Sequence, residues 1–202
     1  MDTKATVTTA PKAHYLSTNA EIKLLKLLKN AKLLGWGSSR CVFEMPGDPS
    51  KVVKLAIGTY SLRQNKLETR LWNDLRDNRL ATITDFGRFV LVMEKLDEVC
   101  DDESFYDDGS GEFDEPLAVY EWLNGVLGET SDNFQLGIKN GQWKCYDYGF
   151  DAEIVAFKQV GNADYGVDLA DRRKIIDAMI ALLRQKQPVT KLMEELKQKL
   201  PS

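Results

Sequence analysis

The chain has one histidine, His14, and three cysteines, Cys41, Cys100 and Cys145, among its 202 residues. A single histidine excludes a zinc site built on several histidines. A Ser-His-Asp triad would have to use this one residue, which lies in a polar N-terminal segment. The cysteines are widely spaced and form no CxxC pair, which is typical of reduced thiols in a cytosolic protein.

Long apolar runs and an apolar leader are also missing. No stretch approaches the roughly eighteen apolar residues of a membrane span, and the first residues lack the apolar core of a signal peptide. The net charge is −4, so a general affinity for nucleic acid or for anionic membranes is not expected. With 29% charged and 43% hydrophobic residues, the chain reads as soluble and globular.

The first part of the chain predicts an arm, a helix and a run of strands. Residues 1–17 are polar and predict a flexible N-terminal arm. Thr18 and Glu21 have capping-box spacing, which predicts a helix start. Its leucines and lysines would suit packing on a sheet or lying on a membrane surface. Strands are then predicted on both sides of a glycine-rich turn and at residues 52–57, 81–86 and 88–94, with a helix at 61–76.

An acidic segment separates this region from the rest of the chain. Residues 97–115 hold ten acidic residues and no Lys or Arg. They predict a linker or loop that is either simply solvated or in contact with a basic partner surface. After it, helices are predicted at about 115–127, 168–186 and 189–199. Asn140-Gly141 predicts a hairpin that joins residues 134–138 to 143–146.

The first group of residues that could carry chemistry is a glycine-rich turn. Gly35 and Gly37 lie between two predicted strands, with Ser38 and Val42 following them. Glycines in such a turn let backbone N–H groups approach phosphate oxygens. An ordinary glycine-containing hairpin would show the same pattern.

The second group is a lysine in an apolar strand and a glutamate in the next helix. Lys54 lies within Val-Val-Lys-Leu-Ala, and burying it is costly unless something pairs with it. Phosphate oxygens on one side and the Glu68 carboxylate on the other would supply such partners. Alternatively, Lys54 reaches solvent at a sheet edge.

The third group consists of Asn133 and Asp147, at the two ends of the predicted hairpin. An asparagine amide oxygen and an aspartate on adjacent loops can hold Mg²⁺ against the phosphates of a nucleotide. Two ordinary turn residues would give the same spacing.

Taken in order, residues 31–150 resemble the protein-kinase-like superfamily, with the closest likeness to small kinase-like proteins of bacteria and phages. Arg40 stands where protein kinases often have a third glycine of their Gly-rich loop. The resembling stretches are 33–42 for the Gly-rich loop, 53–56 for the strand with the phosphate-binding lysine, 64–68 for the helix with the pairing glutamate, 91–96 for the strand into the hinge and 147–149 for the metal-binding DFG element.

The resemblance implies binding of ATP and Mg²⁺. It assigns cofactor binding to Gly35, Gly37, Ser38, Val42, Lys54, Glu68 and Glu94, and metal binding to Asn133 and Asp147. It also implies an α+β, two-lobed fold. The N-lobe, residues 18–96, would hold a five-stranded antiparallel sheet with a helix, and a reduced, mostly helical C-lobe would cover residues 116–202.

The catalytic loop departs from the family pattern. In kinases an aspartate precedes the metal-binding asparagine by five positions. If Asn133 is that asparagine, Gly128 stands at the aspartate position, while Asp132 is a possible stand-in base. The resemblance therefore favours a pseudokinase that acts through a protein partner in a bacterial or phage-infected cytoplasm. The alternatives are an active phosphotransferase or AMP-transferase that uses Asp132, and an interaction module that binds no nucleotide.

Overall fold

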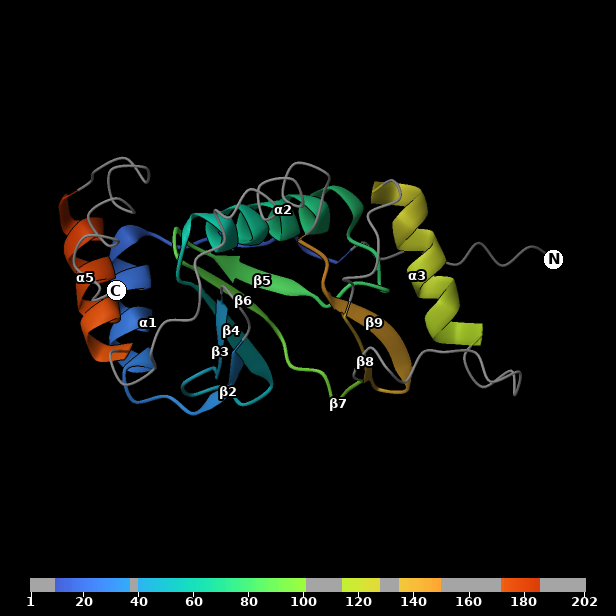
Figure 1. Cartoon of the computed structure of the whole chain (residues 1–202), viewed down its shortest axis with the longest axis horizontal. Helices are drawn as coiled ribbons and strands as arrows, with labels where there is room; N and C mark the ends of the chain where they lie inside the picture. Colours follow the sequence, from blue (N-terminus) through green and yellow to red (C-terminus); the bar gives the residue numbers. More distant parts are fainter. Residues whose placement is uncertain (1–9, 37–39, 101–113, 128–134, 150–171, 186–202) are drawn as a thin grey trace.

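The computed structural model describes residues 10–36, 40–100, 114–127, 135–149 and 172–185 (Figure 1). The helices in this part of the chain are α1 (Thr18–Leu28), α2 (Thr59–Leu75), α3 (Asp114–Leu127) and α5 (Arg172–Gln185). The strands are β1 (His14–Tyr15), β2 (Leu33–Trp36), β3 (Arg40–Glu44), β4 (Lys51–Ala56), β5 (Ile83–Phe86), β6 (Val90–Glu94), β7 (Glu98–Val99), β8 (Gln135–Lys139) and β9 (Gln142–Asp147). None of these helices combines the length and the apolar character needed to span a lipid bilayer.

The main sheet contains six strands in the order β1-β5-β6-β4-β3-β2. The five strands from β5 to β2 are antiparallel to their neighbours. The sixth strand, β1, runs parallel to β5 and pairs His14 with Asp85. The sheet is therefore mixed and one strand larger than expected. Because the Leu16 N–H also donates to the Phe86 carbonyl at 2.7 Å, residues 14–16 of the predicted arm are paired with the sheet rather than free.

Alternation along the strands sends side chains into two separate cores. In β4, Val53 and Leu55 point to a core that contains α1 and α5, whereas Val52 lies in a second core with Trp72 of α2. Successive residues of a strand face opposite sides of the sheet. Lys54 therefore faces the same side as Val52, toward α2, and not toward a sheet edge.

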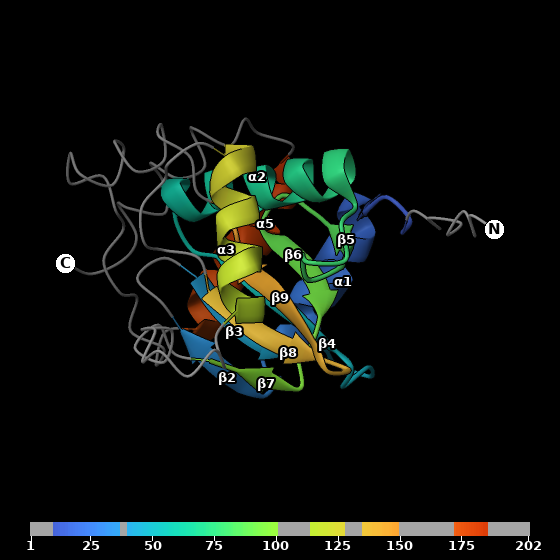
Figure 2. The ribbon, with the colours of Figure 1, turned by 90° about the vertical axis from the view of Figure 1, so that its right-hand side faces the viewer.

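The C-terminal helix α5 packs beside α1 and not within a separate C-lobe (Figures 1 and 2). Its residues Ile176 and Met179 are fully buried in the core that also holds Leu25 of α1 and Phe43 of β3. The Arg172 guanidinium donates to the carbonyl oxygens of Lys29 and Ala31, just after α1. Helix α5 comes from the predicted C-lobe, yet it packs in the same core as α1 of the predicted N-lobe. The reason is that the apolar faces of both helices cover one side of the sheet together. The second predicted C-terminal helix, 189–199, lies outside the described residues.

A second, three-stranded sheet has the order β7-β8-β9. Its hairpin turns at Asn140 and Gly141, whose φ angles of 51° and 74° are those of a type I′ turn. The hairpin is confirmed at the predicted position. Strand β7 belongs to the predicted acidic linker, and Asp97 accepts hydrogen bonds from Lys139 and from the Asn140 N–H. The start of that segment is therefore part of the sheet, while residues 101–113 lie outside the described residues.

Strand β9 is attached to the chain segment that leads into β5. The Ala81 N–H donates to the Cys145 carbonyl, and the Cys145 N–H donates to the Arg79 carbonyl, each at 2.8 Å. Tyr148, just after β9, is fully buried and donates its hydroxyl to the Ala81 carbonyl at 3.1 Å. These contacts hold the end of β9, and with it Asp147, beside α2.

Truncating a buried side chain of α5 should destabilise the whole protein. We expect Met179→Ala to lower the free energy of unfolding by about 2–5 kcal/mol, because it opens a cavity under the main sheet. The matched control is Arg184→Ala on the exposed side of the same helix, with an expected change within about 0.5 kcal/mol. Urea denaturation measures both, and equal effects of the two variants would contradict the packing of α5 on the sheet.

Candidate functional site

Helix α2 presents a mainly polar face to the sheet. It begins after Gly58, where the Ser61 hydroxyl accepts the Gly58 N–H at 2.9 Å. Buried side chains then recur every four residues, at Tyr60, Gln64, Glu68 and Trp72. Of the large apolar residues in this helix from Leu62 onward, which are Leu62, Leu67, Leu71, Trp72 and Leu75, only Trp72 is buried. The helix is rotated so that Glu68 faces β4, because a buried lysine there needs a partner.

Lys54 and Glu68 form the predicted ion pair. The Lys54 ammonium lies 3.1 and 3.2 Å from the two Glu68 carboxylate oxygens. Lys54 is 3% exposed and Glu68 is 0% exposed, so the pair is closed to bulk solvent. The ammonium also donates to the Tyr146 carbonyl of β9 and lies 4.0 Å from the Asp147 carboxylate. The charged groups of Lys54, Glu68 and Asp147 thus lie together.

A fourth charge, the Arg40 guanidinium, completes the cluster. Its Nη1 donates to Glu68 at 2.9 Å and to the Asn65 amide oxygen at 3.3 Å, and its Nη2 donates to Asp147. Arg40 is only 5% exposed. We call Arg40, Lys54, Glu68 and Asp147 the charge cluster; it contains two cations and two carboxylates, so its formal charge is zero.

Burial and the nearby charges together shift the pKa values of the carboxyl groups in the cluster. Burial raises the pKa of Glu68, although Arg40 and Lys54 act in the opposite direction. Burial also disfavours ionisation of Asp147, but the nearby Arg40 and Lys54 outweigh it and hold the pKa of that carboxyl below its usual range. Asp147 is therefore a carboxylate at neutral pH, available as a hydrogen-bond acceptor and an anionic partner.

Gly149 lets the chain after β9 pass close to α2. A Cβ atom at this position would lie 2.8 Å from the Gln64 carbonyl oxygen and 2.9 Å from the Glu68 Cγ. Both contacts are shorter than van der Waals distance, and one of them is with backbone. The glycine of the predicted metal-binding element therefore brings Asp147 next to Glu68.

The other predicted site residues lie in different parts of the structure or outside the described residues. Val42 pairs with Lys54 across β3 and β4, and it packs on the α2 side of the sheet. Gly35 pairs with Val42 at an irregularity in β2. The Glu94 carboxylate accepts hydrogen bonds from Lys144 and from the backbone N–H of Thr82, and so serves an internal contact. Outside the described residues lie Gly37, Ser38, Gly128, Asp132 and Asn133, so the Gly-rich turn and the catalytic loop remain predictions.

A divalent metal at Asp147 does not fit the described residues as they are arranged. The Asp147 carboxylate is already paired with the Arg40 guanidinium, and the Lys54 ammonium lies 4.0 Å away. The described part of the chain contains no group of three or more His, Cys, Asp or Glu side chains that could hold a metal ion. Of the two expected Mg²⁺ ligands, Asp147 is thus paired with positive charge from the protein itself, and Asn133 lies outside the described residues.

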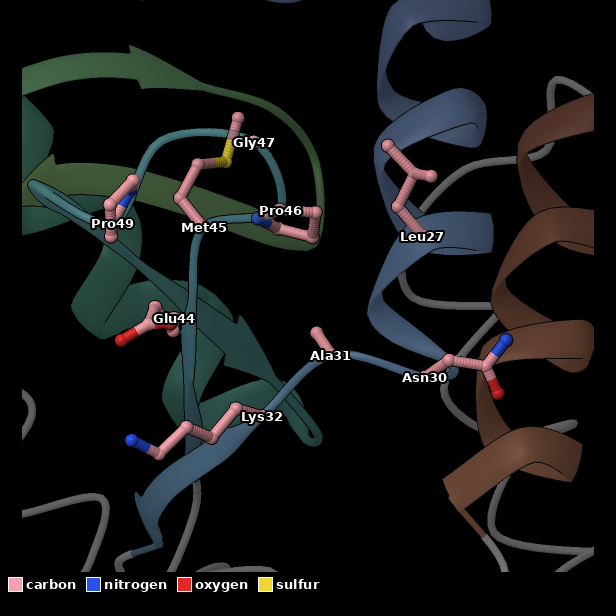
Figure 3. Close-up of a pocket in the computed structure, with 9 residues that line it drawn as sticks. All are labelled: Leu27, Asn30, Ala31, Lys32, Glu44, Met45, Pro46, Gly47 and Pro49. Carbon is pink, nitrogen blue, oxygen red and sulfur yellow. The ribbon is translucent and has the colours of Figure 1, made fainter.

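A surface pocket of about 360 Å³ lies away from the charge cluster, between the end of α1 and the turn from β3 to β4 (Figure 3). Its lining is mixed, with Leu27, Met45 and Pro46 beside Lys32 and Glu44. It shares no residue with the cluster, and the residues that the sequence singled out do not line it.

Sequence reasoning missed Arg40 and Asn65 as members of the site. The sequence pattern marked Arg40 only as a replacement for a glycine. The available signal for its place in the site was its position two residues before Val42 in β3. Side chains two apart on a strand share a face, so Arg40 had to face the same side as Val42 and its partner Lys54. The identity of its acceptors depended on the rotation of α2, which the sequence pattern did not show.

Adding a methyl group at Gly149 should separate β9 from α2. We expect Gly149→Ala to destabilise the fold by about 1–3 kcal/mol, because the new Cβ collides with backbone. The control is Gly125→Ala in α3, where a Cβ meets nothing within 4 Å. That change should stabilise by about 0.4–1 kcal/mol through reduced chain entropy in the unfolded state. Chemical denaturation of both variants tests the close approach, and a neutral Gly149→Ala would contradict it.

The stability that Asp147 contributes should depend on pH. Because its folded-state pKa lies below the ordinary value of 3.8, its pairing stabilises the fold above that value and is lost as the pH falls through the folded-state pKa. We expect Asp147→Asn to cost about 1–3 kcal/mol near neutrality and progressively less in acid. Urea denaturation of both proteins between about pH 3 and 7 measures this difference. A difference that grows in acid would reverse the assigned sign.

Comparisons with known proteins add little. No protein-family model matches the chain, and no curated protein matches it in sequence. Among solved structures, the streptomycin–ATP–APH(2″)-IIa ternary complex is similar over 90% of this chain and 87% of that chain, with 13% sequence identity and a TM-score of 0.38. A similarity at this level does not by itself establish a shared fold or function.

Proposed function

We propose that this chain is a kinase-like protein that binds a nucleotide such as ATP at the charge cluster and acts through a protein partner without transferring phosphate. The observation that carries the proposal is the buried Lys54–Glu68 pair with Asp147 beside it. In protein kinases a strand lysine paired with a helix glutamate, together with an aspartate that follows a later strand, holds the phosphates of ATP.

The order of the elements supports the same proposal. Three antiparallel strands, β2 to β4, are followed by α2 and then by β5 and β6, with Lys54 on the third strand and Glu68 in the helix. This is the arrangement that the resemblance implies. The absence of phosphoryl transfer rests on the sequence, where Gly128 stands at the expected aspartate position. A missing base removes the group that orients the acceptor hydroxyl.

One observation favours a second candidate, an interaction module that binds no nucleotide. The Arg40 guanidinium lies between Glu68 and Asp147 and, together with Lys54, balances the charge of both carboxylates. A closed, neutral cluster could serve only to hold the fold together. Nucleotide binding and its dependence on Lys54 separate these two candidates.

The nature of the partner is proposed from charge alone. The acidic segment 97–115 would select a basic surface, and the association rate with such a partner should fall as salt is added. Asp97 is already paired with Lys139 inside the protein. The recognition of a partner is therefore assigned to the acidic residues that follow β7.

The nucleotide proposal is tested by ATP binding to variants of β4. We expect ATP to raise the melting temperature of the wild type through linkage, and Lys54→Ala to weaken binding by at least about tenfold. The control is Lys51→Ala on the same strand. The Lys51 ammonium lies 3.2 Å from the Asp48 carboxylate at the surface, so this variant should bind ATP like the wild type. Calorimetry gives the dissociation constants, and circular dichroism shows whether Lys54→Ala is folded.

Three results would change the proposal. No binding by the folded wild type would favour the interaction module, and equal binding by Lys54→Ala would exclude the charge cluster as the nucleotide site. Transfer of the γ- or α-phosphate from labelled ATP to protein, abolished in Asp147→Ala, would instead show an active transferase.

A further inference from the structure

The position of Arg40 has a consequence for the ligand that the charge cluster accepts. Its side chain comes from β3 and crosses to α2 and to the end of β9, where it meets acceptors on Asn65, Glu68 and Asp147. Its side chain is 6% exposed and that of Glu68 is 0% exposed. A buried guanidinium held by two carboxylates on different elements is a fixed part of the site.

The charge balance of the cluster leaves no role for a metal cation from outside the protein. Arg40 and Lys54 together supply two positive charges to the carboxylates of Glu68 and Asp147. A Mg²⁺ ion needs oxygen ligands at about 2.1 Å in near-octahedral geometry. At Asp147 it would have to share the carboxylate with the Arg40 guanidinium, which is paired with Oδ1. It would also be repelled by the Lys54 ammonium, which lies 4.0 Å from the same oxygen.

A guanidinium can also take over part of what a metal ion does for a phosphate. It carries five N–H donors in a planar fork, which is enough to hold two carboxylates and still donate to a phosphate oxygen. Unlike a metal ion, it keeps its charge at every physiological pH and cannot dissociate from the protein. Arg40 has partners in Glu68, Asn65 and Asp147 that orient its plane.

We propose that Arg40 replaces the divalent metal at Asp147, so that this site takes the phosphates of a nucleotide in their metal-free form. This inference rests on the proposed nucleotide binding. It names the ligand class as a nucleoside polyphosphate without Mg²⁺, and it makes Arg40 the residue that determines this preference.

The first test compares ATP binding with and without Mg²⁺. Calorimetry is done with ATP in EDTA and with ATP in excess MgCl₂, on the wild type and on Arg40→Ala. We expect Mg²⁺ to change the wild-type dissociation constant by less than about twofold, and to tighten binding to Arg40→Ala by at least about tenfold. Arg70→Ala is the control, since Arg70 lies on the exposed side of α2 and contacts only Asp74 among the described ion pairs. A wild type that itself needs Mg²⁺ for tight binding would overturn the inference.

A second measurement keeps the inference separate from nucleotide binding. Mn²⁺ binding without nucleotide is followed by electron paramagnetic resonance for the wild type, Arg40→Ala and the double variant Arg40→Ala/Asp147→Asn. We expect bound Mn²⁺ only in Arg40→Ala, because only there is the Asp147 carboxylate released. Mn²⁺ bound by the wild type through Asp147, or no Mn²⁺ bound by Arg40→Ala, would overturn the inference.

The outcomes for the two proposals can be told apart. If no protein binds ATP in either buffer, the proposed function fails and the Mn²⁺ result alone decides the role of Arg40. If the wild type binds ATP only with Mg²⁺, the proposed function stands and the role of Arg40 fails. Should Arg40→Ala not fold, Arg40→Gln is used in its place, because it retains more of the side-chain volume and removes the charge.

Discussion

Four charged side chains share one buried volume between the main sheet and α2, and the surrounding structure is arranged to satisfy them. Burying a charge without a partner costs several kcal/mol, so each member depends on the others. Arg40 and Lys54 come from adjacent strands, Glu68 from the helix and Asp147 from the second sheet. The cluster therefore links the consecutive elements β3, β4 and α2 to the end of β9, which lies far away in sequence. It also explains why α2 turns a polar face to the sheet.

The two apolar cores hold the elements that carry these charges. Alternate residues of β4 and β6 fill the core under α1 and α5 on one side and the core beneath α2 on the other. Tyr148 anchors the end of β9 in the second core, and Gly149 allows it to approach α2. Since the cores contain residues from both predicted lobes, the charge cluster lies within continuous packing rather than between two independently packed halves.

The contacts that stabilise the cluster also limit what it can bind. A phosphate group can reach Lys54 only where Glu68 leaves part of the ammonium unshared. A metal ion at Asp147 would share that carboxylate with Arg40 and would be repelled by Lys54. Anionic ligands are the ones for which two fixed cations provide direct attraction. The function proposed for this chain and the inference about metal-free nucleotide both follow from this distribution of charge.

Local sequence signals determined several features directly, because they depend on neighbours in the chain. Strand alternation, the helix from Thr18 and the hairpin at Asn140-Gly141 are of this kind. So was the expectation that Lys54 needs a carboxylate partner, since a lysine in an apolar strand carries its own desolvation cost. The tertiary structure alone decided the parallel pairing of β1, the packing of α5 on α1 and the insertion of Arg40 between Glu68 and Asp147. These depend on strand register and helix rotation, which are set by contacts between segments distant in sequence and leave no local periodicity to read.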